Sequence, residues 1–380
     1  MTVVSPFSVG WTVRDSLKPM ETAATDASTQ QELSVYINDE AIRTFVTKKL
    51  DAEDVQGLKA SSTADSEHCR LAPVPFESTR QIANFYFLTS TLAIGHGHRE
   101  ALIRLFGRSS SATTGFAVCN LWRDCPDHSL DRPYLHSFLE RCREPEKEPH
   151  LLHLTLFGKE RPTTPLPEEA AYWETADDLA GDYLKLLTEI VTGLEKRDCA
   201  DFFKFAEKVK QSSQGSTSVN PLIEAVISTF PSYRDTAFWR GREVWFLKKA
   251  QLLAHDLYKH LPVEFPFSDL QRELCIFADN AIPCVLAAEG MLVVSPRLQR
   301  DIDTLQPLAE EDIALLRGLS ICAADRIVAV SQERQRVKDE TESQFLLPHC
   351  GVLDEFLFAL SRREEYKHLR RHRNVGTLAY

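Results

Sequence analysis

The sequence lacks the features of a membrane-spanning or disulfide-stabilised protein. No apolar run approaches the roughly 20 residues that a membrane-spanning helix needs. The N-terminus contains no apolar stretch typical of a signal peptide. The nine cysteines are odd in number and scattered, without a Cys-x-x-Cys pair, which indicates reduced thiols. We therefore expect a cytoplasmic protein, or one that is also nuclear, with no membrane partner.

Clustered positive charge is also scarce. The chain has 44 Lys and Arg residues against 55 Asp and Glu residues, a formal net charge of −11. Neutralising the phosphates of a nucleic acid requires grouped cations, so this balance argues against direct nucleic-acid binding. The basic run 367–373 is the exception, and we interpret it as a solvated C-terminal segment.

Several signatures of catalytic and metal sites are missing. The sequence has no phosphate-binding glycine loop, dinucleotide fingerprint or Ser/His/Asp nucleophile signature. His96 and His98 flank a glycine and resemble half of a zinc site, but no closed ligand set with metal-site spacing accompanies them. We expect no metal and no other cofactor. The two histidines either contact a base or a phosphate, or lie exposed in a turn.

The composition that remains is that of an ordinary globular protein, with 43% hydrophobic and 26% charged residues. A chain of 380 residues fits one large domain or two closely packed ones. The Ser/Thr-rich composition of 1–31 predicts a disordered tail. We expect 32–380 to form a single domain. Within it, 105–178 is weakly patterned and contains several prolines, with one strand-like run, Leu151–Phe157. We expect a divergent, less regular accessory region over about 96–177.

Helical periodicity dominates the second half of the chain and predicts a mainly α protein. Ser295-Pro296 has the residues of a helix start, a cap followed by proline in the first turn. The same signal occurs at Asn220-Pro221. Apolar residues recur at helical spacing over 179–194, 222–230, 244–261 and 313–330, the last interrupted by Arg317 and Asp325.

One acidic residue stands within the most apolar part of the chain. Asp279 follows the run 274–278 and precedes another apolar run that begins at Ala281. An unpaired carboxylate in such surroundings costs several kcal/mol, so a compensating cation is expected. Lys248, on the preceding amphipathic segment, is the candidate. The pair fits either an active site or an ordinary buried salt bridge.

The chain contains, in this order, the runs Phe230-Pro231-Ser232-Tyr233-Arg234-Asp235, Gly241 to Gln251, Asp256-Leu257-Tyr258 and Phe277-Ala278-Asp279. Together these runs resemble the queuosine salvage family of queuosine 5'-phosphate N-glycosylases. The order and spacing match over roughly 178–330, and more loosely near both ends. The resemblance implies a helical core similar to that of DNA glycosylases. It also implies hydrolysis of queuosine 5'-monophosphate, or a related modified nucleotide, to free base and ribose 5-phosphate in queuine salvage.

The resemblance also assigns roles to individual residues. Cleavage of an N-glycosidic bond needs a carboxylate beneath the anomeric carbon and contacts for the departing base. Asp279 matches the family's active-site aspartate, and Lys248 its lysine, which either holds the 5'-phosphate or keeps Asp279 ionised. Phe277 is expected to wall the pocket. Arg242, Asp256 and Asp354 fall on family-like positions, as substrate contacts or as structural ion pairs and caps. His372 and Arg373 match the terminal motif and are expected to anchor the C-terminal segment.

The chain departs from the family at several positions that would shape the pocket. Asn280 replaces an aromatic residue, Phe358 replaces a tryptophan, and the segments 90–98 and 313–316 differ as well. We therefore expect Asn280, His96 and His98 to line an altered substrate pocket. Two alternatives stay open: an N-glycosidase for a different nucleotide, and a catalytically silent paralogue that acts as a binding module. The sequence leaves the oligomeric state open.

Overall fold

Helices account for most of the residues that the computed structural model describes, which confirms the mainly α prediction. The structure describes residues 13–26, 30, 32–50, 76–144, 146–214, 216–268, 270–337, 350–373 and 377–378. The chain divides into two compact units, each assembled from separated stretches of sequence. The sequence predicts one domain over 32–380.

Unit 1 combines Met1–Ala64, Asp235–Gln251 and Asp269–Asn374. Its elements are α1 (Val13–Thr25), β1 (Val35–Ile37), α3 (Asp39–Lys48), β2 (Thr236–Trp239), β3 (Arg242–Trp245), the first turn of α14 (Lys248–His260), α15 (Leu270–Glu273), α16 (Ala281–Ala288), β4 (Leu292–Val294), α17 (Pro296–Asp303), α18 (Glu310–Val337), α19 (Cys350–Leu360) and α20 (Glu364–Lys367).

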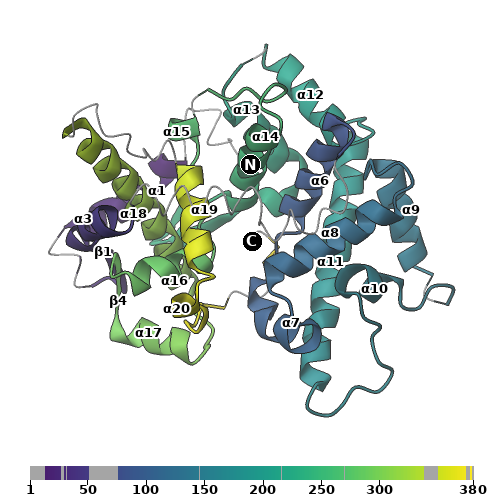
Figure 1. Ribbon diagram of the computed structural model, residues 1–380, viewed down its shortest axis with the longest axis horizontal. Coiled ribbons are helices and arrows are strands. Elements are labelled where there is room, and N and C mark those ends of the chain that lie inside the picture. The colour runs from purple at the N-terminus through teal and green to yellow at the C-terminus, as the bar shows by residue number, and fades with distance from the viewer. Residues whose placement is uncertain are drawn as a thin grey trace. The chain divides into compact units, whose positions relative to one another are not determined.

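The long helix α18 forms the centre of unit 1 and packs against α1 and α3 (Figure 1). Gly318 on α18 makes the contact with α1 close, since a side chain there would overlap the sulfur of buried Met20. Two short antiparallel ladders complete the unit: β1 pairs with β4, placing Val35 opposite Val294, and β2 pairs with β3. These contacts fix α18, which carries Arg317 toward the candidate site.

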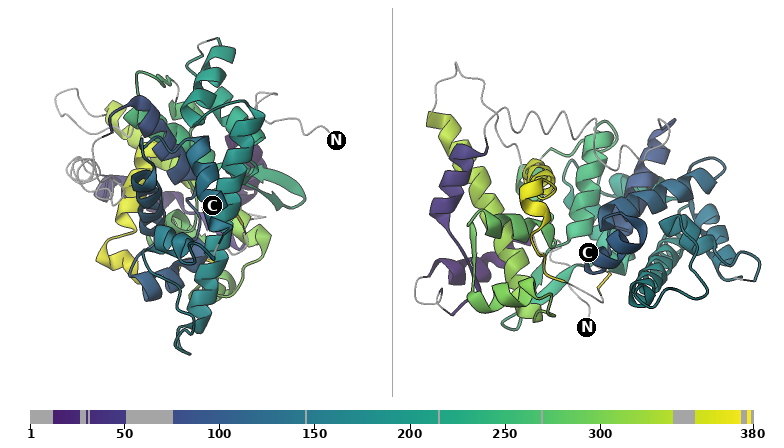
Figure 2. Two further views of the ribbon diagram at one scale, coloured as in Figure 1. Left: turned by 90° about the vertical axis from the view of Figure 1, so that its right-hand side faces the viewer. Right: turned by 60° about the horizontal axis from the view of Figure 1, so that its bottom comes forward.

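Unit 2 combines Asp65–Arg234, Leu252–Ser268 and the last residues of the chain. Its elements are α6 (Thr79–Thr91), η1 (His96–His98), α7 (Arg99–Phe106), α8 (Ser110–Asp124), α9 (Arg132–Cys142), α10 (Leu151–Phe157), α11 (Ala170–Lys196), α12 (Phe202–Ser212), α13 (Asn220–Thr229), η2 (Pro231–Tyr233) and the rest of α14. The long α11, teal in Figure 2, packs along α7 and α9.

Stacked aromatic rings fill the centre of unit 2. Phe87 lies parallel to Phe202, with 4.2 Å between ring centroids, and also stacks on Tyr233. The hydroxyl of Tyr233 lies 2.7 Å from the hydroxyl oxygens of Ser90 and Thr91, so its polar end is satisfied inside the core. These contacts join α6, α12 and η2 into one packed core.

Three expectations about local structure are wrong or incomplete. The disordered tail predicted over 1–31 is wrong for Val13–Thr25, which form α1 with Leu17 and Met20 buried; residues 1–12 lie outside the described part. The strand-like run Leu151–Phe157 is the helix α10, ended by Gly158 with φ +69°. Leucine favours helices, and this run lacks the alternation of a half-buried strand. The region 96–177, expected to be less regular, contains η1, α7, α8, α9 and α10.

Other helical predictions are confirmed. The periodic segment 179–194 lies in α11, and 313–330 lies in α18. Ser295 caps α17, with its hydroxyl accepting a hydrogen bond from the backbone N–H of Leu298 at 3.3 Å. The predicted start at Asn220-Pro221 is right for the proline, which stands in the first turn of α13, but wrong for the cap: Asn220 is the first residue of the helix, Val219 occupies the cap position, and no side chain caps it.

Candidate active site

The segment 274–280, which ends at Asp279 and Asn280, is buried yet has no regular secondary structure. A buried backbone must still form hydrogen bonds, and distant side chains of unit 1 supply them. Gln251 Oε1 accepts from the N–H of Cys275 at 2.6 Å, and Asp354 Oδ1 accepts from the N–H of Phe277 at 2.8 Å. Arg14 donates to the carbonyl of Leu274 at 2.8 Å. Residues far apart in sequence therefore fix the shape of this segment.

Arg317 ties this segment to the start of α14. Its Nε donates to the carbonyl of Ala278 at 2.9 Å. Its two terminal nitrogens bind both carboxylate oxygens of Asp235, at 2.8 and 2.6 Å. The guanidinium also stacks on Phe246, 4.1 Å from the ring centroid. Because both charged side chains are 2% exposed or less, this bidentate pair is a rigid internal brace.

Asp235 in turn places Lys248 at the first position of α14. Asp235 Oδ2 accepts from the backbone N–H of Lys248 at 3.0 Å, satisfying a donor that a helix start leaves free. Leu247, at the turn from β3 into α14, adopts φ +52°. That turn directs the chain so that the Lys248 ammonium lies 3.3 Å from Asp279 Oδ2. The ion pair predicted from the sequence is therefore present.

The carboxylate of Asp279 has a second stabilising partner. Its Oδ1 accepts from the backbone N–H of Ala281 at 2.7 Å, at the N-terminus of α16. That helix end carries partial positive charge, which favours an anion there. The side chains of Asp279 and Lys248 are only 7% and 6% exposed. The charged form is thus held by one ammonium and one helix end in a site with little water.

The irregular C-terminal segment 368–373 lies against the same loop. Asn280 Nδ2 donates to the carbonyl of His372 at 3.4 Å, and the Cys284 thiol contacts the carbonyl of Arg370 at 3.5 Å. His372 is 3% exposed. Desolvation lowers the pKa of its imidazole to about 4, with the Arg317 charge acting in the same direction and Asp279 opposing it. His372 is therefore neutral at pH 7.

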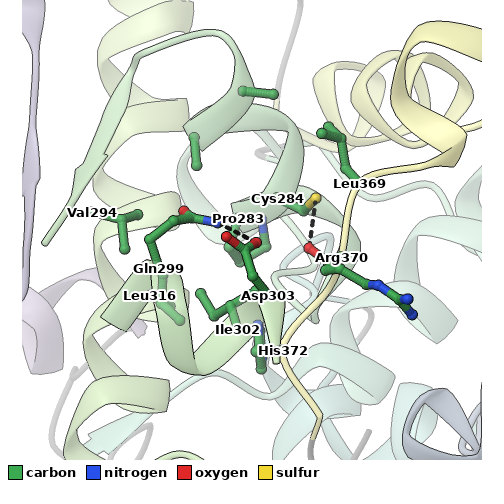
Figure 3. Close-up of a pocket in the computed structure, with 12 residues that line it drawn as sticks. Pro283, Cys284, Val294, Gln299, Ile302, Asp303, Leu316, Leu369, Arg370 and His372 are labelled. Carbon is green, nitrogen blue, oxygen red and sulfur yellow. Dashed lines mark hydrogen bonds between the residues drawn. The ribbon is translucent and has the colours of Figure 1, made fainter. Parts of the chain in front are cut away.

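A cavity of about 140 Å³ lies along α16 on the side of this C-terminal segment (Figure 3). Its lining includes Pro283 and Cys284 of α16, Leu316 of α18 and His372. Gln299 and Asp303 of α17 are hydrogen-bonded to each other at 2.9 Å in its wall. Neither Asp279 nor Lys248 lines it. This cavity is smaller than the roughly 300–1,000 Å³ of typical ligand pockets and is too small for a nucleotide.

The other residues predicted for the site fall in different places. Phe277, two residues before Asp279, is 3% exposed. Asp354 on α19 accepts a hydrogen bond from the backbone N–H of Phe277 and so stabilises the loop. Arg242 is exposed at the start of β3. Within unit 2, Asp256 lies half-buried on α14, and His96 and His98 form η1. The roles of all these residues as substrate contacts remain predictions.

The sequence-based list of site residues omits Asp235, Arg317 and His372. Arg317 was detectable as a lone cation within the apolar pattern of 313–330, since a buried charge requires a partner. Asp235 is the last residue of the first run that resembles the family. His372 matches the family's terminal motif, but the sequence predicts only an anchoring role for it, because tertiary packing is what brings it to Asn280.

Within the described ranges, no group of three or more His, Cys, Asp or Glu side chains is arranged to hold a metal ion. None of the helices described is both long and apolar enough to cross a membrane.

The fold is mainly helical, and its candidate site is a buried carboxylate–ammonium pair at a helix N-terminus. The family model described as "Queuosine salvage protein" matches residues 175–378, more than half of the chain. The chain belongs to this family. The match includes every residue of the Asp235–Arg317 and Lys248–Asp279 pairs.

Curated relatives of the chain are named queuosine 5'-phosphate N-glycosylase/hydrolase. The queuosine 5'-phosphate N-glycosylase/hydrolase of Sphaerobacter thermophilus is 28% identical over 151 residues, 38% of this chain and 45% of that protein. The enzyme of the same name from Mus musculus is 28% identical over 164 residues, 41% of this chain and 47% of that protein. The one from Schizosaccharomyces pombe is 29% identical over 111 residues, 28% of this chain and 32% of that protein. The matches thus span less than half the length of each relative.

Proposed function

We propose that this chain is an N-glycosyl hydrolase that cleaves queuosine 5'-monophosphate, or a closely related modified nucleotide, to free base and ribose 5-phosphate. The observation that carries the proposal is the buried Lys248–Asp279 pair, with 3.3 Å between Nζ and Oδ2. The names of the relatives supply the substrate class. A cytoplasmic or nuclear location and the absence of a cofactor belong to the same proposal.

The chemistry follows from charge. As the base departs, positive charge develops on the sugar, and a fixed carboxylate beneath the anomeric carbon stabilises it. Lys248 and the Ala281 N–H already hold the Asp279 carboxylate in place, so the groups around it do not have to rearrange during the reaction. A water molecule then attacks the anomeric carbon. Its oxygen becomes the sugar's 1-hydroxyl, and the proton that it loses balances the proton that the departing base gains. Lys248 orients the phosphate or keeps Asp279 ionised.

Incubation of the purified protein with queuosine 5'-monophosphate, followed by chromatographic detection of queuine, tests the proposal. Asp279→Asn is the matched loss-of-function variant. Asp301→Asn, which removes a carboxylate from a surface pair with Arg297, is the control. We expect release by the wild type and by Asp301→Asn, and none above background by Asp279→Asn. No release by the folded wild-type protein would refute the queuosine assignment.

A second candidate is a catalytically silent paralogue that binds a nucleotide or a partner. The burial of Asp279 and Lys248 outside the described cavity favours it, together with Asn280 in place of an aromatic residue. Binding of queuosine 5'-monophosphate without release of queuine would identify this second function. Release from a different nucleoside 5'-monophosphate would instead identify an altered base specificity.

A further inference from the structure

Two buried polar atoms beside Asp279 lack a hydrogen-bond partner among the described residues. They are Asn280 Oδ1 and His372 Nε2. Both residues are buried, and each is 3% exposed. A buried acceptor or donor left unmet costs about 1–3 kcal/mol, and such groups in native proteins call for a ligand, a water or a functional reason.

The two residues are joined to each other and to the catalytic candidate. Asn280 follows Asp279 directly in the chain, and its Nδ2 donates to the backbone carbonyl of His372. The imidazole of His372 is close enough to Asp279 and Arg317 for both charges to act on it. The same contacts that hold the C-terminal segment therefore deliver His372 to the Asp279 loop.

The hydrogen-bonding capacity of the pair is specific. An amide oxygen only accepts, so Asn280 Oδ1 requires a donor. A neutral imidazole has one N–H and one lone pair, so His372 Nε2 can either donate or accept. A hydroxyl group, which both donates and accepts, meets both atoms at once. An anionic group would not, because Asn280 Oδ1 and the neighbouring Asp279 carboxylate would repel it.

We propose that Asn280 Oδ1 and His372 Nε2 bind the sugar hydroxyl adjacent to the anomeric carbon, the 2'-hydroxyl of a ribonucleotide substrate. The inference rests on the proposed function, in which Asp279 lies beneath the anomeric carbon. The 2'-hydroxyl is the hydroxyl group nearest to that carbon, and hydrogen bonds to it strengthen as the glycosidic bond breaks. His372 thus contacts the substrate, in addition to the anchoring role expected from the sequence.

The kinetic test compares queuosine 5'-monophosphate with its 2'-deoxy analogue. We expect the wild type to prefer the ribonucleotide in kcat/KM, and His372→Leu or Asn280→Ala to reduce that preference by roughly ten- to a hundredfold. His372→Gln, which retains a donor and an acceptor, should preserve most of it. Cys284→Ala is the control, since Cys284 contacts the same C-terminal segment but offers no group to the sugar. Equal losses on both nucleotides in His372→Leu would overturn the proposal.

A binding test separates this inference from the proposed hydrolysis. Calorimetry with ribose 5-phosphate and 2-deoxyribose 5-phosphate requires no turnover. Preference for ribose 5-phosphate in the wild type, lost in His372→Leu, supports the hydroxyl site even if no queuine is released. Release of queuine without any ribo/deoxy preference would leave the proposed function standing and refute the hydroxyl site. A protein that neither releases queuine nor distinguishes the two sugars refutes both.

Discussion

At the scale of single residues, the candidate site depends on paired buried charges. Lys248 compensates Asp279, and Arg317 compensates Asp235, with all four side chains at most 7% exposed. Removing one member of such a pair leaves a charge in a medium that solvates it poorly, whereas removing both does not. This asymmetry provides a test of the Lys248–Asp279 pair that does not depend on knowing the substrate.

We expect Lys248→Met to lower the free energy of unfolding by about 3–5 kcal/mol, because Asp279 is then buried without its cation. The double variant Lys248→Met, Asp279→Leu should recover most of that loss. Chemical denaturation of the wild type, both single variants and the double variant gives the coupling energy. Additive losses in the double variant would show that the two side chains do not stabilise each other.

His372 makes the stability of the folded protein depend on pH. Its pKa is about 4 in the folded chain against 6.5 ordinarily, so the unfolded chain binds the extra proton between these values. Stability is therefore retained above pH 6.5 and lost as pH falls toward 4, by on the order of 3 kcal/mol in total. His372→Leu should lose less stability than the wild type over this range. Denaturation midpoints that shift equally for both proteins would contradict the assignment.

At the scale of elements, long periodic helices were predictable from the sequence and the irregular loop was not. The helices α11 and α18 follow from apolar spacing, and α17 from its Ser295 cap. The path of 274–280 could not be derived locally, because its hydrogen bonds come from residues 14, 251, 317 and 354. Only the Lys248–Asp279 pair could be predicted from the sequence, because a buried charge requires a partner.

The first helix was missed although its pattern was present. Val13, Leu17, Met20 and Ala24 recur at helical spacing and are all buried in α1. The Ser/Thr-rich surroundings and Pro19 inside the helix obscured this stripe. The same helix carries Arg14, which bonds to the Leu274 carbonyl and to Asp325. A segment predicted to be disordered therefore supports the candidate site.

The surroundings of two helical glycines predict opposite effects when each is replaced by alanine, and one of them tests the close packing of α1 on α18. Gly318→Ala should lower the free energy of unfolding by about 1–3 kcal/mol, because the new Cβ would overlap the sulfur of buried Met20. Gly181→Ala in α11, where nothing lies within 4 Å, should raise it by about 0.5–1 kcal/mol through helix propensity. Denaturation followed by circular dichroism measures both. Equal stabilisation by the two substitutions would disprove the close α1–α18 contact.

At the scale of the whole chain, the residues proposed for function are distributed over both units. Unit 1 contains Lys248, Asp279 and the residues that brace them, while His96, His98 and Asp256 belong to unit 2. The family match from 175 to 378 takes in the first group but leaves His96 and His98 outside. The case for a role in catalysis is therefore strongest within unit 1.

Hydrogen exchange in the presence of a bound nucleotide tests this distribution. In the free protein the N–H groups of Phe277 and Ala281 are bonded to the carboxylates of Asp354 and Asp279. A ligand that fixes the Asp279 loop lowers the frequency of its local opening, so we expect slower exchange over 274–281 with queuosine 5'-monophosphate that is replenished to stay saturating despite its hydrolysis. Asp279→Asn, which keeps the loop but changes its charge, serves as the comparison. Unchanged exchange over 274–281 in the liganded wild type would exclude this loop from the binding site. Unchanged exchange at 96–98 would remove His96 and His98 from the substrate contacts while leaving Asp279 in place.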